Sequence, residues 1–170
     1  MKVFYADLSD LELKNIRKPE LKKLQSQIGY SLVDYVAKNF YGIDNTDLII
    51  QNGKPKFQAS TMCFNISHSN EIVAVAFDTK PLGFDIEFIQ PKDIKQLADR
   101  YNTNFQTIED FYIFWTNLEA EIKIQSEIEQ RYTDKIASNY MMTILSSNPE
   151  RFSRIPTVKI PTRRLQFQAV

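Results

Sequence analysis

The chain has 170 residues, of which 43% are hydrophobic and 25% charged, so it is long enough for one globular domain with its own core. Lys plus Arg and Asp plus Glu number 21 each, which argues against a general nucleic-acid-binding protein. A single cysteine excludes an intramolecular disulfide, and no apolar run approaches the ~18 residues of a membrane span, so we expect a cytoplasmic protein without a signal peptide.

The first half of the chain predicts one long helix among short strands. Apolar residues recur at three- and four-residue steps after Pro19, which predicts a helix that begins there and ends near Gly42. Turns are expected at residues 52–55 and 67–70. The predicted strands are residues 1–8, 47–51, 62–66 and 71–77.

The second half predicts two more helices, at residues 94–101 and 107–130. Its predicted strands are residues 82–89, 140–145 and 157–168, the last interrupted by Pro161. No interdomain linker is evident. We therefore expect an α+β protein, residues 1–170 forming a single domain of helices packed on mostly antiparallel strands.

Two carboxylates share one face of the strand at residues 82–89. Because strand side chains alternate, Asp85 and Glu87 lie opposite the apolar face. Two acids this close repel each other unless a metal cation, a Lys or Arg side chain, or a shared proton lies between them. A solvent-facing polar side of an amphipathic strand remains the simpler interpretation of this pattern alone.

The helix at residues 107–130 adds a third acid, Glu119. In helical projection, Glu119 lies within the predicted apolar stripe, and Lys123 lies at its edge one turn later. A carboxylate on a packing face is costly unless it is paired with a cation or bound to a metal. Either a Glu119–Lys123 pair or a hard cation fits, with Mg²⁺ favoured and Mn²⁺ as the alternative. The stripe consists of Ile108, Phe111, Trp115, Leu118 and Ile122, with Tyr112 at its margin.

Four short segments resemble, in order, the motifs of the 4′-phosphopantetheinyl transferases, specifically the surfactin-activator type. They are "GKPKF" (53–57), "FNISHS" (64–69), "LGFDIE" (82–87) and "FYIFWTNLEAEIK" (111–123). The resemblance covers the chain from about residue 53 to residue 123.

The resemblance implies a fold and an activity. The fold would be a pair of pseudo-symmetric α+β lobes, at about residues 1–80 and 81–170, with an abbreviated C-terminal lobe. The activity would be Mg²⁺-dependent transfer of the phosphopantetheine arm of coenzyme A to a serine of an acyl or peptidyl carrier protein, as in fatty acid biosynthesis. A monomer that binds neither nucleic acid nor membranes is expected.

The resemblance also implies residue roles. Asp85, Glu87 and Glu119 would bind Mg²⁺, and Glu119 would also be the base for the carrier serine. Lys123 would neutralise charge on the transferred phosphoryl group. Contacts to the phosphates of coenzyme A would come from Lys54, Ser67 and His68. Trp115 and Phe111 are interpreted as core residues, and Ser69 as a hydrogen-bonding turn residue.

Three positions depart from the family pattern. Gln25, Gln106 and Leu118 stand where the family usually has an arginine, a glutamate and a lysine. One alternative is therefore an inactive relative that binds coenzyme A or a carrier protein. Another is an unrelated interaction module whose acids and Lys123 form a salt-bridge network.

Overall fold

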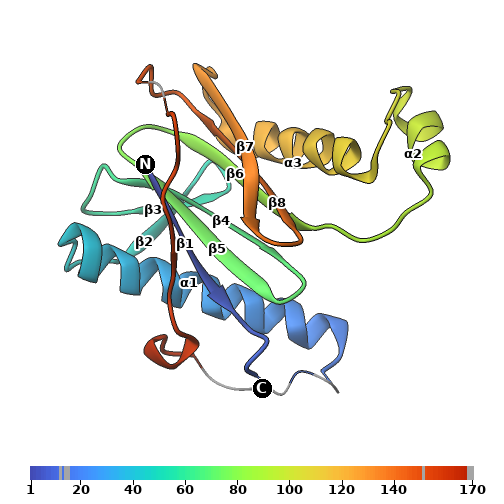
Figure 1. Cartoon of the computed structure of the whole chain (residues 1–170). Helices are drawn as coiled ribbons and strands as arrows, with labels where there is room; N and C mark the ends of the chain where they lie inside the picture. The colour runs from blue at the N-terminus through green and yellow to red at the C-terminus, as the bar shows by residue number, and fades with distance from the viewer. Residues whose placement is uncertain (12, 14–15, 151, 168–170) are drawn as a thin grey trace.

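The computed structural model describes residues 1–11, 13, 16–150 and 152–167 and has the expected α+β class (Figure 1). The strands are β1 (Lys2–Asp7), β2 (Leu48–Gln51), β3 (Lys54–Phe57), β4 (Cys63–Ser69), β5 (Ile72–Asp78), β6 (Leu82–Phe88), β7 (Gln130–Ala137), β8 (Tyr140–Ser146) and β9 (Thr157–Lys159). The helices are α1 (Lys18–Tyr41), α2 (Ile94–Tyr101), α3 (Ile108–Ile124) and the short 3₁₀ helix η1 (Thr162–Arg164). No helix of the described residues is long and apolar enough to cross a membrane.

The two larger sheets each carry one long helix (Figure 1). One sheet has the strand order β4-β5-β1-β9 and packs against α1, and the other has the order β6-β8-β7 and packs against α3. The β2–β3 hairpin forms a separate two-stranded sheet. Apart from the parallel pair β1–β9, the paired strands are antiparallel, as expected.

The core consists mainly of two apolar clusters on opposite faces of β5. Val73, Val75 and Phe77 face α1, whereas Ala74 and Ala76 face the inner side of β6 and β8. Every residue of β5 is buried, as expected for a strand covered on both faces. The layers therefore run α1, first sheet, second sheet, α3, and β6 lies inside the molecule with its two faces against different layers.

Helix α1 confirms the predicted boundaries. Pro19 lies in its first turn, where a missing backbone N–H costs nothing, and Gly42 ends it in the left-handed conformation at φ 64°. Its buried face includes Gln25, whose side-chain amide donates a 2.8 Å hydrogen bond to the carbonyl of Asn70. Gln25, at a position where the sequence resemblance implies an arginine, therefore holds the β4–β5 turn.

Several predicted boundaries were wrong. The turn expected at 67–70 is confined to its end, because β4 continues through Ser69 and only Asn70 has the positive φ of a tight turn. The expected turn at 52–55 is a two-residue Asn52–Gly53 hairpin turn, which leaves Lys54 as the first residue of β3. Of the strand expected at 157–168, the part up to residue 167 forms only β9, and residue 168 lies outside the described residues.

Helix α3 is shorter than predicted, and its packing face differs from the predicted stripe. It ends at Ile124, six residues before the predicted helix end at residue 130, where β7 begins instead. Ile122 was expected in the stripe but is 66% exposed. At its closest approach to β6 and β8, the helix places the small residues Thr116 and Ala120, next to Gly83 and Thr143. Its buried residues are Phe111, Tyr112, Thr116, Ala120 and Ile124.

Candidate active site

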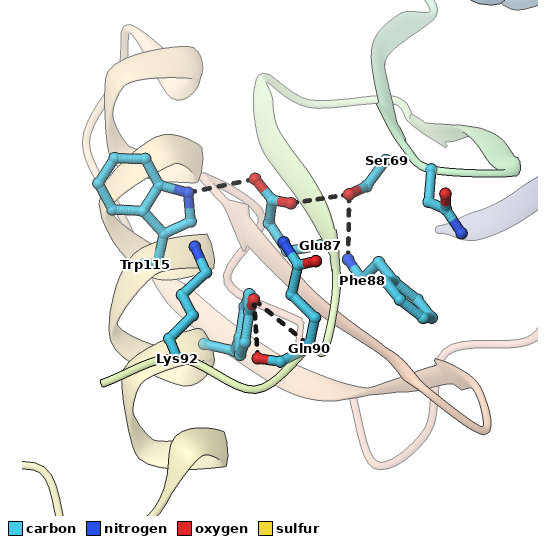
Figure 2. A pocket seen from close by; sticks show the side chains of 8 residues that line it. Ser69, Glu87, Phe88, Gln90, Lys92 and Trp115 are labelled. Carbon is cyan, nitrogen blue, oxygen red and sulfur yellow. Dashed lines mark hydrogen bonds between the residues drawn. The ribbon is translucent and has the colours of Figure 1, made fainter. Parts of the chain in front are cut away.

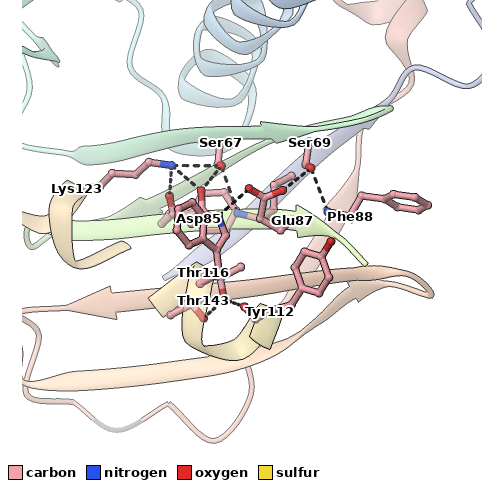
Figure 3. A network of polar contacts seen from close by, with 12 residues as sticks. Ser67, Ser69, Asp85, Glu87, Phe88, Tyr112, Thr116, Lys123 and Thr143 are labelled. Atoms are coloured by element: carbon pink, nitrogen blue, oxygen red, sulfur yellow. Dashed lines mark hydrogen bonds and ion pairs between the residues drawn. The ribbon is translucent and has the colours of Figure 1, made fainter. Parts of the chain in front are cut away.

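Two serines of β4 join the two larger sheets. Ser67 Oγ donates a 2.8 Å hydrogen bond to Asp85 and accepts one of 3.2 Å from the Ile86 backbone N–H. Ser69 Oγ makes the same pair of contacts two residues further on: it donates to Glu87 at 2.7 Å and accepts from the Phe88 N–H at 3.0 Å (Figure 3). Among the described residues no backbone–backbone bond joins β4 to β6, so these hydroxyls take the place of a strand ladder.

Asp85 is the most deeply buried acid of the site. Its Oδ1 accepts hydrogen bonds from Ser67 and, at 2.7 Å, from Lys123 Nζ. Its Oδ2 is also buried and has no hydrogen-bond partner among the described residues. Burial raises the pKa of Asp85 to about 6, against the opposing effect of Lys123. A buried carboxylate oxygen without a partner is the kind of atom that accepts a cation.

Lys123 links the end of α3 to β6. Its ammonium donates to Asp85 Oδ1, to the Phe84 carbonyl at 3.1 Å and to Ser67 Oγ at 3.3 Å (Figure 3). This ion pair differs from the Glu119–Lys123 pair that was one interpretation of the sequence. The positive charge that the strand acids were expected to need is thus supplied, at Asp85, by a lysine.

Glu87 is held from both sides. Trp115 Nε1 donates a 3.2 Å hydrogen bond to Oε1, and Ser69 donates to Oε2 (Figure 2). The interpretation of Trp115 as a core residue alone was therefore incomplete. The signal for its second role is present in the sequence, because a partly buried indole usually finds an acceptor for its N–H.

Glu119 lies on the same face of α3 as its neighbours Trp115 and Lys123. The three are spaced four residues apart, and the two outer ones contact Glu87 and Asp85 respectively. Glu119 is half-buried and makes no side-chain hydrogen bond within the described residues. No group of three or more His, Cys, Asp or Glu side chains is arranged to hold a metal ion in the part of the chain that the structure describes.

A basic pocket of about 720 Å³ adjoins the acids. It lies between α1, the β2–β3 hairpin, β4 and the end of α3, and its walls include Lys54, Lys56, His68 and Lys123. Ser67 is not part of its wall, and its hydroxyl contacts Asp85. The pocket therefore brings together two of the three residues expected to contact phosphates, together with Lys123.

Two buried polar atoms of this pocket's lining residues have no partner among the described residues: Lys54 Nζ and Asn65 Oδ1. Burial, followed by the charges of Lys123 and Lys56, lowers the pKa of Lys54. Burial and then the charge of Lys123 also lower the pKa of His68. Each positive charge in this pocket makes protonation of its neighbours less favourable. Such a pocket is suited to binding a multiply charged anion, which would relieve the repulsion between the positive charges.

The chain is similar to known enzymes across this region. A 4′-phosphopantetheinyl transferase of Bacillus subtilis is 34% identical over 111 residues, which cover 56% of this chain and 49% of that protein. The 4′-phosphopantetheinyl transferase psf-1 of Bacillus pumilus is 29% identical over 160 residues, covering 73% of this chain and 68% of that protein. The chain is a relative of the surfactin-activator type of 4′-phosphopantetheinyl transferase.

A third similar protein, the 4′-phosphopantetheinyl transferase Sfp of Bacillus subtilis strain 168, is 32% identical over 111 residues, 56% of this chain and 49% of that protein. The chain thus spans about half the length of two of these three relatives. No protein-family model matches the chain. The family expected from the four sequence motifs is confirmed by these phosphopantetheinyl transferase relatives.

Proposed function

We propose that the protein transfers the 4′-phosphopantetheine arm of coenzyme A to a serine of an acyl or peptidyl carrier protein, including carriers of fatty acid synthesis. The observation that carries this proposal is the position of the Asp85, Glu87 and Lys123 cluster beside a basic pocket of about 720 Å³. Acids next to a cationic pocket match a reaction in which a pyrophosphate must be bound and its charge neutralised.

The nucleotide phosphates of coenzyme A would enter the basic pocket. Lys54 would bind one phosphate, since its buried ammonium has no partner within the described residues, and His68 another. Ser67 would act indirectly, by holding Asp85 and Lys123 in place. Each charge-assisted phosphate contact contributes about 1.5–3 kcal/mol.

Asp85 offers an acceptor atom for a divalent cation. The observation in favour is Asp85 Oδ2, a buried acceptor without a partner among the described residues. Asp85, Glu87 and Glu119 would hold Mg²⁺, and the bound ion would neutralise negative charge on the pyrophosphate oxygens. Lys123, whose ammonium lies 2.7 Å from Asp85 Oδ1, would neutralise charge on the transferred phosphoryl group.

The transfer itself breaks one phosphorus–oxygen bond and forms another. The carrier serine oxygen attacks the β-phosphorus, its proton passes to Glu119 directly or through a water, and 3′,5′-ADP leaves with the bridging oxygen. Glu119 is suited to this role because it is half-buried and its carboxylate is not engaged by another described side chain.

We further propose that the two helix-bearing sheets correspond to two pseudo-symmetric lobes of one domain, with the second lobe abbreviated, and that the protein acts as a monomer. The free Cys63 fits the reducing environment of the cytoplasm, where the carriers would be met.

Incubation with coenzyme A, Mg²⁺ and apo carrier proteins tests the activity. We expect the carrier to gain the mass of the phosphopantetheine arm, and Glu119→Gln to reduce this transfer while leaving the thermal unfolding midpoint close to that of the wild type. If no carrier gains mass in a panel of acyl and peptidyl carriers, the transferase proposal is wrong. Coenzyme A binding without transfer would then identify an inactive relative.

A further inference from the structure

Glu87 has both carboxylate oxygens fixed by neutral donors from different elements. Trp115 of α3 donates to Oε1 at 3.2 Å, and Ser69 of β4 donates to Oε2 at 2.7 Å (Figure 2). A carboxylate oxygen carries two acceptor positions, so each retains one for a further donor or a cation. The hydrogen bonds therefore set the plane of the carboxylate without blocking it.

Neither donor is free to turn away. The Ser69 hydroxyl accepts the Phe88 N–H at 3.0 Å, which leaves its proton directed at Glu87. The Trp115 indole stacks on Phe111 with ring centroids 6.2 Å apart and an angle of 19° between the planes. It also contacts the Tyr101 ring at 5.9 Å. Packing against two aromatic rings fixes the direction of the indole N–H.

The carboxylate faces a small polar pocket of about 280 Å³. Its lining includes Ser69, Glu87 and Trp115 together with Gln90 and Lys92. This pocket shares no lining residue with the basic pocket that contains Lys54 and His68. Glu87 therefore borders a different pocket from the proposed nucleotide site.

We propose that Trp115 and Ser69 are positioning residues that orient Glu87 toward a bound divalent cation. The inference rests on the proposed function, because it takes Glu87 to be a ligand of that cation. Donors that fix the orientation of a metal-binding carboxylate typically change metal affinity by about ten- to a hundredfold when they are removed. A residue with a purely structural role would change the free energy of unfolding but not the affinity of the folded protein.

The first experiment uses the fact that Trp115 is the only tryptophan in the chain. Its fluorescence therefore reports on the surroundings of Glu87 without any substitution. We expect Mn²⁺, added with coenzyme A, to quench this fluorescence in a saturable manner, and Mg²⁺ to reverse the quenching by competition. Saturable Mn²⁺ binding, measured by electron paramagnetic resonance, that leaves the fluorescence unchanged would overturn the inference.

The second experiment compares Mn²⁺ affinities of variants by the same resonance measurement. Trp115→Phe keeps an aromatic ring but removes the N–H, and Ser69→Ala removes the hydroxyl; each is expected to weaken Mn²⁺ binding about ten- to a hundredfold. Ser69→Thr retains the hydroxyl and should restore the affinity. Tyr112→Phe is the matched control, because its hydroxyl lies in the same pocket but contacts Gln90.

The outcomes separate the two proposals. Equal Mn²⁺ affinity in the wild type, Trp115→Phe and Ser69→Ala overturns the positioning role and leaves the transferase proposal standing. A wild-type chain that binds no Mn²⁺ in the presence of coenzyme A overturns both. If Trp115→Phe does not fold, the Mn²⁺ affinities of Ser69→Ala and Ser69→Thr and the fluorescence of the wild type still test the positioning role.

Discussion

The ammonium of Lys123 lies 2.7 Å from Asp85 Oδ1, in an ion pair that ties the last turn of α3 to the middle of β6 (Figure 3). The Asp85 side chain is 6% exposed and that of Lys123 26% exposed, so the pair is shielded from solvent on the acid side. Its loss would leave a buried carboxylate with only Ser67 as a described partner.

Lys123→Met is therefore expected to lower the free energy of unfolding at pH 7. Removing one partner of a buried charged hydrogen bond costs about 1–3 kcal/mol, because the remaining group keeps its desolvation penalty. Urea unfolding of the metal-free protein measures the change.

Lys135→Met is the matched control for this change. Lys135 pairs with Glu109 at the same distance of 2.7 Å, but both side chains are more than 40% exposed. Exposed pairs contribute at most about 1 kcal/mol. Equal effects of the two substitutions would show that the Lys123–Asp85 pair has no special importance for stability.

Lys54→Met is expected to have opposite effects on stability and on ligand binding. The Lys54 ammonium is buried with no partner among the described residues, so its removal should raise the free energy of unfolding of the ligand-free protein by about 1–3 kcal/mol. The same change should weaken binding of 3′,5′-ADP about ten- to a hundredfold, since one charged phosphate contact is lost.

Calorimetry of 3′,5′-ADP binding and urea unfolding test these two effects together. Lys56→Met serves as the comparison, because Lys56 lines the same pocket but is exposed. A Lys54→Met protein that binds 3′,5′-ADP like the wild type would exclude Lys54 from the phosphate site.

His68 is the only histidine of the chain, so proton magnetic resonance gives a single imidazole titration curve. Burial and the charge of Lys123 lower its pKa below the ordinary 6.5. We expect a titration midpoint below that value, an increase when 3′,5′-ADP is bound, and an increase in Lys123→Met. A midpoint that does not respond to 3′,5′-ADP would place His68 away from the phosphates.

The same lowered pKa has a consequence for stability. Between the folded and unfolded pKa values the unfolded chain binds more protons at His68, so the free energy of unfolding rises with pH across this interval. The stability contributed by His68 is complete above about pH 6.5 and is lost as the pH falls through the lowered value. His68→Gln should remove this part of the pH dependence, as measured by urea unfolding at pH 5 to 8.

Gly83→Ala is expected to push α3 away from β6. A Cβ at Gly83 would lie 2.0 Å from the backbone carbonyl oxygen of Ala120, which cannot rotate aside. Overpacking of this kind costs about 1–3 kcal/mol or more, and the displaced helix would carry Glu119 and Lys123 out of position. Thermal unfolding and the transfer assay measure both effects.

Gly29→Ala provides the contrast. The nearest atom to a Cβ at Gly29 is the Ile66 Cγ2 at 2.9 Å, the end of a side chain that can adjust. Alanine also favours a helix over glycine by about 1 kcal/mol. We expect a small net change here, and a Gly83→Ala protein as stable as Gly29→Ala would contradict the close contact of α3 with β6.

The sequence predicted those parts of the fold that depend on local signals. The bounds of α1 follow from Pro19 and Gly42, which act within one turn of the backbone. The common face of Asp85 and Glu87 follows from strand alternation alone. These features need no knowledge of the neighbouring elements.

The parts that the sequence did not predict depend on tertiary contacts. Hydrophobicity placed Ile122 inside and gave no role to Thr116, yet Thr116 is buried and its hydroxyl lies 2.8 Å from that of Thr143 on β8. The polar residues at 67–69 favour a turn by composition, but they continue a strand because they pair with β5 and because the two serine hydroxyls contact β6.

In the candidate site, too, local patterns predicted which residues matter but not which residues contact one another. Strand and helix periodicity singled out Glu119 and the two strand acids, but the partner of each strand acid comes from a different element. Lys123 was considered as a partner for Glu119 and contacts Asp85 instead, because α3 packs directly against β6.

Ser67 and Ser69 each satisfy a backbone amide of one sheet and an acid of the proposed catalytic cluster with the same oxygen. Backbone hydrogen bonds between paired strands form with almost any side chain, whereas the contact between β4 and β6 depends on the hydroxyl groups of Ser67 and Ser69. A substitution at either serine would therefore lower the stability of the protein and also change the orientation of Asp85 or Glu87. Variants selected only for folding should retain both serines as strictly as variants selected for activity.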